Sequence, residues 1–180
     1  MNNWRQNWQA GLLPGLSITG FVILARLLGL FQSIEWKALD TALQRRPAET
    51  TDPRITVVTL TEEDIQTTLG YPITDQDLAT LISELQTYDP RVIGIDIFRD
   101  QPVGEGFAAL EAELTSANNV IGIESIEAPS VSPPPMLPDS QIGFADAIVD
   151  NDGRLRRSLL GNADENGNYR FSLTIQLAQA

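Results

Sequence analysis

The longest apolar stretch of the chain lies near its N-terminus, from Gly11 to Phe31 (GLLPGLSITGFVILARLLGLF). Its length matches the roughly 20 residues that a helix needs to cross the hydrocarbon core of a bilayer. The one charge inside it, Arg26, lies near enough to the C-terminal end for its guanidinium to reach the interface. Trp4 and Trp8 precede the stretch and Trp36 follows it, as is typical of interfacial aromatic residues. We therefore predict one transmembrane helix.

Two other interpretations of this stretch stay open. A buried helix of a soluble core is one, and a cleaved signal peptide is the other. A signal peptide has a shorter apolar core and a small-residue cleavage site, and no such site precedes Glu35. Lys37, Arg45 and Arg46 follow the stretch while Arg5 precedes it, which weakly favours a soluble part inside the cell. Long domains often override this bias, so charge alone leaves the side undecided.

The next residues follow a helical period and then a strand pattern. Ile34, Leu39 and Leu43 recur at near-helical spacing, so we expect the membrane helix to continue outward as an amphipathic stalk as far as Pro47. The β-branched run from Ile55 to Leu60 then predicts a strand.

Two helices are expected after this strand. Thr61, with Asp64 three residues on, predicts a helix start, and Gly70 closes that helix. Thr74 opens a second one, and apolar residues at helical spacing form a stripe along it: Leu78, Leu81, Ile82 and Leu85.

The centre of the chain predicts a parallel sheet. Val92 to Phe98 (VIGIDIF) is almost continuously apolar, which is typical of a strand buried on both faces of such a sheet. A helix from Phe107 to Leu114 and a strand from Val120 to Ile123 follow, with right-handed crossovers expected between parallel strands. Ala128 to Pro138 holds five prolines and predicts a surface loop.

The C-terminal part predicts hairpins. Ile142 to Val149 and Leu155 to Leu160 flank the turn Asp150-Asn151-Asp152-Gly153, and Asn166-Gly167 predicts a second turn. Phe171 to Ala180 starts a helix that stops without a cap or breaker, so we expect the domain to continue. The predicted fold class is α/β: a mixed, largely parallel sheet flanked by helices, with a C-terminal β-hairpin, preceded by one transmembrane helix.

Composition narrows the chemistry. The chain has 12 Lys and Arg against 24 Asp and Glu, a net charge of −12. Because such an acidic domain repels phosphate backbones, we expect no nucleic-acid partner. The absence of His and Cys excludes Ser-His-Asp triads, Cys-His pairs and His-rich zinc sites. We expect no catalytic residue, no metal and no cofactor.

The best candidate site lies after the central strand. Asp96, Arg99 and Asp100 stand at or just past its C-terminal end, where open α/β sheets place their ligands. A carboxylate such as Asp96 within an apolar run is costly unless it is paired, so a structurally satisfied Asp is the alternative.

A second candidate is basic. Arg154 and Arg156 follow the Asp150–Gly153 turn, and strand alternation places both on one face of the sheet. Two roles are open for these arginines: they bind an anion together, or they balance the charge of neighbouring carboxylates. The turn lacks the ligands of a calcium loop, and Gly104-Glu105-Gly106 lacks the third glycine of a dinucleotide site.

The sequence resembles the CHASE type 2 sensory domains (cyclase/histidine-kinase-associated sensory extracellular) over nearly all of its soluble part. Tyr71 stands where the family pattern has Trp. The matching segments, in the family's order, are Glu35–Asp40 (EWKALD), Asp52–Val58 (DPRITVV), Tyr71-Pro72-Ile73, Arg91–Phe98 (RVIGIDIF), Asp150–Arg157 (DNDGRLRR) and Ser172-Leu173.

The resemblance implies a topology and a function. It implies a cytoplasmic N-terminus (1–10), a transmembrane helix (11–31), a stalk helix (32–48) and an extracytoplasmic sensory domain (49–180) at the inner membrane. The domain would relay an unknown stimulus, a small ligand or an envelope component, to a cytoplasmic cyclase or kinase. We also expect a homodimer, because coupling across a membrane usually needs relative motion of two chains. The alternatives are a membrane-anchored hydrolase using Asp96 and Asp100, or an interaction module using the proline-rich loop.

Overall fold

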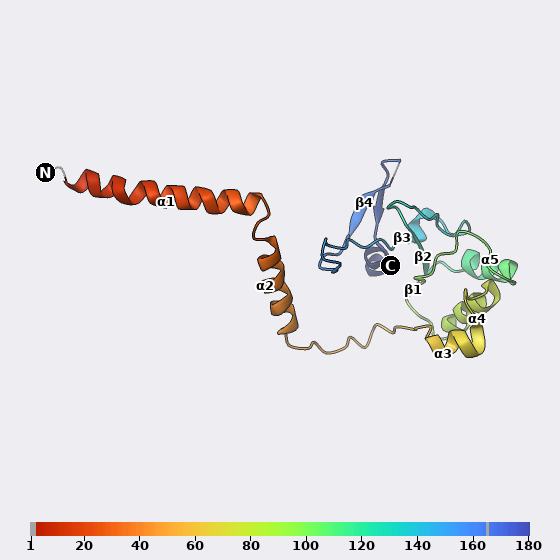
Figure 1. The fold of residues 1–180 in the computed structure, drawn as a ribbon. Coiled ribbons are helices and arrows are strands. Elements are labelled where there is room, and N and C mark those ends of the chain that lie inside the picture. Colours follow the sequence, from red (N-terminus) through yellow and green to blue (C-terminus); the bar gives the residue numbers. More distant parts are fainter. Residues whose placement is uncertain (1–2, 165) are drawn as a thin grey trace. The chain divides into compact units, whose positions relative to one another are not determined.

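The computed structural model describes residues 3–164 and 166–180, with the backbone alone at residues 3–11, 68 and 69. The chain divides into two compact units, Met1–Val57 and Val58–Ala180, which we call the N-terminal and the C-terminal unit. The N-terminal unit contains two helices, and the C-terminal unit is an α/β domain (Figure 1).

The N-terminal unit consists of α1 (Asn3–Leu27) and α2 (Gln32–Gln44), separated by a turn. Gly29 has φ +73°. Its N–H donates to the Arg26 carbonyl at 3.0 Å, and the Leu30 N–H donates to the Ala25 carbonyl at 3.0 Å. This pair of hydrogen bonds is a Schellman motif, which ends a helix with glycine in the left-handed region. The prediction that one helix runs through into a stalk is therefore wrong.

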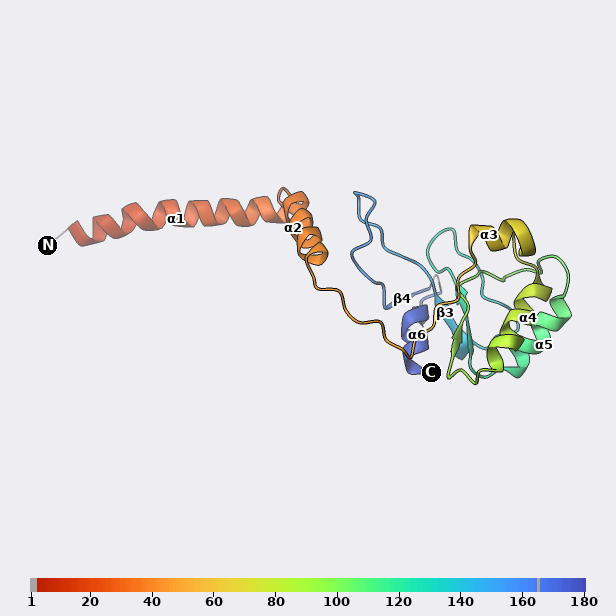
Figure 2. The same cartoon turned by 90° about the horizontal axis from the view of Figure 1, so that it is seen from below.

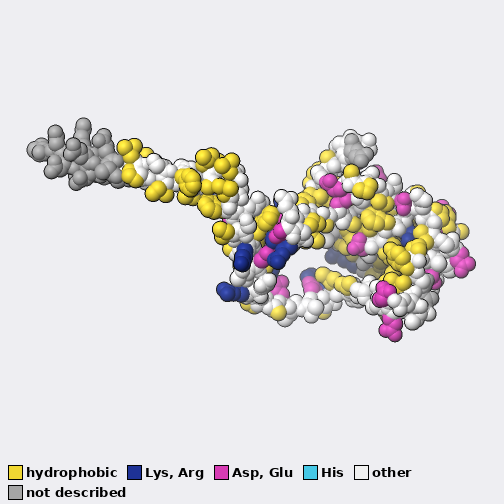
Figure 3. Space-filling view, viewed as in Figure 1, with side chains coloured by type: hydrophobic (Ala, Val, Ile, Leu, Met, Phe, Trp, Pro, Cys, Tyr) yellow, Lys and Arg dark blue, Asp and Glu magenta, His cyan; other side chains and the backbone are white. Residues whose placement is uncertain are grey.

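A membrane span is not established by the helices themselves. Among the residues searched, no single helix is long and apolar enough to cross a bilayer. Leu12–Leu27 and Gln32–Gln44 meet the length and composition criteria only together, as a pair bent by 76°. From Leu12 on, α1 exposes apolar side chains along its surface (Figure 3). Trp4, Trp8 and Arg5 lie outside the described side chains.

The segment between α2 and the next helix has no regular structure. Residues 55–60, predicted as a strand, form none, and Ile55, Val57 and Val58 are exposed. Its local contacts include a turn in which the Ile55 N–H donates to the Asp52 carbonyl at 3.2 Å, and an ion pair between Arg54 and Asp52. The strand prediction is wrong because β-branched composition favours a strand only where a neighbouring strand supplies hydrogen bonds and packing.

The C-terminal unit is built on a parallel sheet of three strands in the order β1 (Ile93–Gly94), β2 (Val120–Glu124), β3 (Ile142–Phe144). Ile93 pairs with Val120, and Gly122 pairs with Ile142. The predicted parallel sheet with flanking helices is confirmed. Helices α4 (Asp75–Gln86) and α5 (Phe107–Ser116) lie on one side of it, and α6 (Leu173–Gln179) lies on the other (Figure 2).

The main core lies between the sheet and the α4–α5 pair. The predicted apolar stripe of α4 faces it, and α4 begins where predicted, with the Thr74 hydroxyl accepting from the Asp77 N–H at 3.1 Å. The short helix α3 (Glu62–Asp64) and the π-helical turn η1 (Ile65–Leu69) precede α4. The core side chains with the least exposure are Leu78, Ile82, Leu110, Leu114 and Val120.

The predicted central strand is shorter and less buried than expected. Within Val92–Phe98 only β1 is a strand, and Ile93 and Ile95 are buried while Asp96 is exposed. Burial thus alternates along this segment, although α6 packs against all three strands on the other face. At Gly143 a Cβ would lie 2.6 Å from the Leu173 Cα, so only glycine permits this close approach of α6.

The C-terminal hairpin is confirmed, in part of the predicted range. Strands β4 (Gly161–Ala163) and β5 (Tyr169–Phe171) pair antiparallel around the Asn166-Gly167 turn. The strands predicted around the Asp150–Gly153 turn are mostly absent: residues 145–148 and 156–160 form no strand, and one bridge between Val149 and Leu155 closes the turn. A 3-10 turn, η2 (Asp139–Gln141), leads into β3.

Candidate functional site

A buried ion pair joins the segment after β1 to the start of α4. The Arg99 Nε lies 3.3 Å from the Asp75 Oδ1, and the two side chains are 5% and 1% exposed. An Nη of Arg99 donates to the Ile73 carbonyl, and the Asp75 Oδ2 accepts from the Val103 N–H at 3.0 Å. Burial lowers the pKa of the Arg99 guanidinium below its usual value, and the Asp75 charge opposes this shift.

The contact between Arg99 and Asp75 also fixes the loop that follows β1. The Asp75 N–H donates to the Val103 carbonyl at 2.9 Å, and the Gln76 N–H donates to the Glu105 carbonyl at 2.8 Å. At Gly106, which has φ +89°, a Cβ would collide with the Gln76 backbone. The loop is thus held against the first turn of α4 by backbone bonds and by one buried charge pair.

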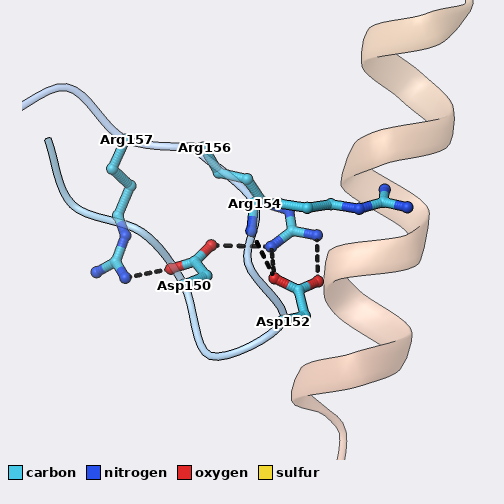
Figure 4. Close-up of polar contacts among 5 residues, drawn as sticks. All are labelled: Asp150, Asp152, Arg154, Arg156 and Arg157. Atoms are coloured by element: carbon cyan, nitrogen blue, oxygen red, sulfur yellow. Dashed lines mark hydrogen bonds and ion pairs between the residues drawn. The ribbon is translucent and has the colours of Figure 1, made fainter.

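A second ionic cluster surrounds the Asp150–Gly153 turn (Figure 4). We call residues Asp150–Arg157 the ionic turn. The Arg156 Nη1 lies 2.9 Å from the Asp150 Oδ2, and its Nη2 lies 2.7 Å from the Asp152 Oδ2. The Arg157 Nη2 donates to the other Asp150 oxygen. The Arg156 side chain is 4% exposed and that of Asp150 is 1% exposed, so one nearly buried guanidinium bridges two carboxylates.

The arginines of the ionic turn keep its carboxylates ionised. The Arg156 guanidinium lowers the pKa of the Asp152 carboxyl to about 2. Hydrogen bonds from Arg156 and then Arg157 lower the pKa of Asp150. Neither carboxyl therefore titrates near neutral pH, and neither is suited to general acid–base catalysis there.

The carboxyl ends of β2 and β3 carry a third polar group of residues. The Arg170 Nε of β5 donates to the Glu124 Oε1 at 2.6 Å. The Asp146 carboxylate accepts from the Ser125 hydroxyl at 2.6 Å and from the Ile126 N–H at 2.8 Å. These contacts attach the hairpin and the loop after β2 to the sheet.

The structure separates the residues proposed from the sequence as ligand contacts. Asp96 and Asp100 are both exposed. Arg99 is buried against Asp75 rather than open to a ligand. Arg156 is bound by two carboxylates, whereas the Arg154 side chain points away from them (Figure 4). The expectation that Arg154 and Arg156 share a strand face is wrong, because the chain forms no strand there.

Several partners escaped the sequence argument. Asp75 looks like an ordinary acidic residue in a first helical turn, and nothing in the pattern pairs it with Arg99, 24 positions away. Glu124 and Arg170 are also far from each other in the sequence. The alternation of Asp150, Asp152 and Arg156 around a tight turn was the only local signal, and it supports charge balancing.

The arrangement offers binding groups rather than reactive ones. The chain has no His or Cys, and within the described part no group of three or more acidic side chains is placed to hold a metal ion. What the C-terminal unit presents is a sheet whose loops are tied down by three sets of ionic contacts.

Comparison with known protein families identifies the class of the molecule. The model of the CHASE2 domain family matches residues 18–180. The chain therefore belongs to the CHASE2 domain family, whose members are sensory extracellular domains of signalling receptors. Comparisons with curated proteins and with solved structures give no match.

Proposed function

We propose that this chain is the extracytoplasmic input domain of a membrane receptor, which relays a stimulus to a cytoplasmic nucleotide cyclase or protein kinase. The single observation that carries this proposal is the family match over residues 18–180, which takes in the whole C-terminal unit and part of α1. Family members sense and do not catalyse.

The structure supports anchoring by the N-terminal unit. Described side chains of α1 such as Leu16, Phe21 and Leu24 are exposed and apolar, and a helix that is apolar on all sides is stable only in an apolar surrounding. We propose that α1 and the turn after it hold the receptor in the inner membrane, with residues 49–180 outside the cytoplasm.

Reporter fusions test the proposed topology. Alkaline phosphatase fused after Ala180 should be active in intact cells, because it folds only outside the cytoplasm, and green fluorescent protein fused there should stay dark. The same fluorescent protein fused before Met1 should be bright and serves as the matched control. A bright C-terminal fusion would place the domain in the cytoplasm and overturn the proposal.

We further propose that the receptor is a homodimer, because signalling across a membrane by single helices requires relative motion of two chains. Subunit counting by stepwise photobleaching of the full chain in lipid nanodiscs measures this directly. Two bleaching steps are expected, and single steps at all protein densities would contradict the proposal.

A further inference from the structure

The turn between α1 and α2 fixes the direction in which the chain leaves α1. The two helices are bent by 76° relative to each other. Transmembrane helices tilt by only about 20° on average from the bilayer normal. If α1 crosses the membrane, α2 runs nearly parallel to the membrane plane. We propose that α2 lies on the outer surface of the bilayer, among the lipid headgroups, and is not an upright stalk. This proposal rests on the anchoring proposed above.

The length of α1 places the turn at the membrane boundary. From Leu12 to Leu27 the helix rises roughly 22 Å at 1.5 Å per residue, somewhat short of the hydrocarbon core. The turn itself is apolar and exposed at Leu28 and Leu30, so it completes the apolar length. Charged residues appear directly after it, beginning with Glu35. The interface therefore falls where α2 begins.

The surface of α2 suits this position. None of its residues is buried. Leu39 and Leu43, one turn apart on the same face, are 43% and 51% exposed, and the half-buried Trp36 lies on the same side, one turn before Leu39. A helix with apolar side chains along one side and charges elsewhere binds in the plane of the interface. In water the same apolar side chains would remain uncovered.

The charges around α2 complement an anionic lipid surface. Lys37, Arg45 and Arg46 give residues 32–46 a net charge of +1, although the whole chain carries −12. Glu35, at the start of α2, lies 3.5 Å from Arg26 at the end of α1, so it is partly neutralised. Long basic side chains place their charge at headgroup level while their stems cover apolar surface. The predicted partner is therefore a bilayer that contains anionic phospholipid.

Site-directed spin labelling distinguishes a surface helix from an upright stalk. Because the chain has no cysteine, single variants Trp36→Cys, Leu39→Cys and Leu43→Cys, which lie on one side of α2, can be labelled in the full chain. Each is reconstituted into vesicles of phosphatidylcholine and phosphatidylglycerol. Depth is measured from the accessibility of the label to oxygen and to a water-soluble nickel chelate. All three labels should lie at similar shallow depths, with several-fold less nickel accessibility than Gln44→Cys, which faces another side.

The opposite result is equally clear. An upright stalk would place the label at Leu43 about 10 Å farther from the bilayer than the label at Trp36. That outcome, or nickel accessibility at Leu43 equal to that at Gln44, overturns the surface position of α2.

A label at Val22→Cys separates failure of this proposal from failure of anchoring. It should lie deep in the bilayer. A deep label at Val22 together with a distant one at Leu43 leaves anchoring intact and overturns only the surface helix. A water-accessible label at Val22 overturns both.

The turn can be tested in the same assay. Gly29→Ala disfavours the left-handed conformation at this position, so α1 should tend to continue and carry the Leu43 label outward. Gly20→Ala, in the middle of α1 with no atom within 4 Å of the added Cβ, is the matched control and should leave the depth unchanged. An unchanged depth in Gly29→Ala as well would contradict the role of the turn.

Discussion

At the scale of single residues, the C-terminal unit depends on a few charges that water scarcely reaches. Arg99 and Asp75 are the clearest case, since both are nearly inaccessible and the Asp75 Oδ1 and Arg99 Nε have only each other at 3.3 Å. Removing one partner leaves an uncompensated buried charge, whereas removing both leaves none.

We predict that Arg99→Met lowers the free energy of unfolding by about 3–5 kcal/mol, because the Asp75 carboxylate stays buried without its cation. The double variant Asp75→Leu/Arg99→Met should lose less than the sum of the single losses. Denaturant unfolding of the chain in detergent measures these energies. Glu111→Gln, on the exposed side of α5, is the control and should change stability by less than about 0.5 kcal/mol. Additive losses would show that the pair is not coupled.

The ionic turn predicts that the stability of the folded state depends on pH in the acid range. Its carboxyls have pKa values lowered in the folded state, that of Asp152 to about 2, so their stabilisation is complete above the ordinary value of 3.8. It is lost as the pH falls toward 2. Carboxyl NMR titration should show that Arg156→Gln raises the pKa of both Asp150 and Asp152.

Arg157→Gln provides the matched control for this titration. Arg157 contributes to the lowered pKa of Asp150 but not to that of Asp152. The variant should therefore raise the pKa of Asp150 alone. Equal effects of the two arginine variants on Asp152 would contradict the geometry of the ionic turn.

At the scale of elements, the sequence predicted best where local chemistry decides the outcome. The caps at Thr61 and Thr74 begin helices as expected, because each hydroxyl accepts from a backbone N–H within its own first turn. The Asn166-Gly167 hairpin also forms as predicted, because its turn too is decided by neighbouring residues. These features need no partner that is distant in the sequence.

The wrong predictions concern elements that depend on distant partners. Ile55–Leu60 has strand composition but no neighbouring strand, and of the strand expected through Asp96 only Ile93 and Gly94 pair with β2. The ion pair of Arg99 was not predicted either, because nothing local in the sequence shows that Arg99 pairs with Asp75. The break at Gly29 did have a local signal, which is a glycine inside an apolar run. In the prediction, the transmembrane composition of that run outweighed this signal.

At the scale of the whole molecule, the two units predict a preferred site of proteolysis. The exposed segment of residues 45–60 has no helix or strand, and backbone of this kind fits readily into a protease. Trypsin should therefore cut first after Arg45, and the fragment that ends at Ala180 should keep a cooperative thermal transition. Arg156 serves as internal control, because its side chain is 4% exposed and bound by two carboxylates. Earlier cleavage there would contradict the division into units.

The irregular segment of residues 47–60 also limits the kind of mechanical signal that it can carry. A helix that joins two bodies transmits twist and compression, but a chain without regular structure resists only being stretched. Through this segment, a change in the C-terminal unit would reach α2 as a pull and not as a rotation or a piston stroke. Receptors coupled in this way respond to how far the sensory domain is drawn from the membrane, and lengthening the segment would then weaken the response in proportion to the slack it adds.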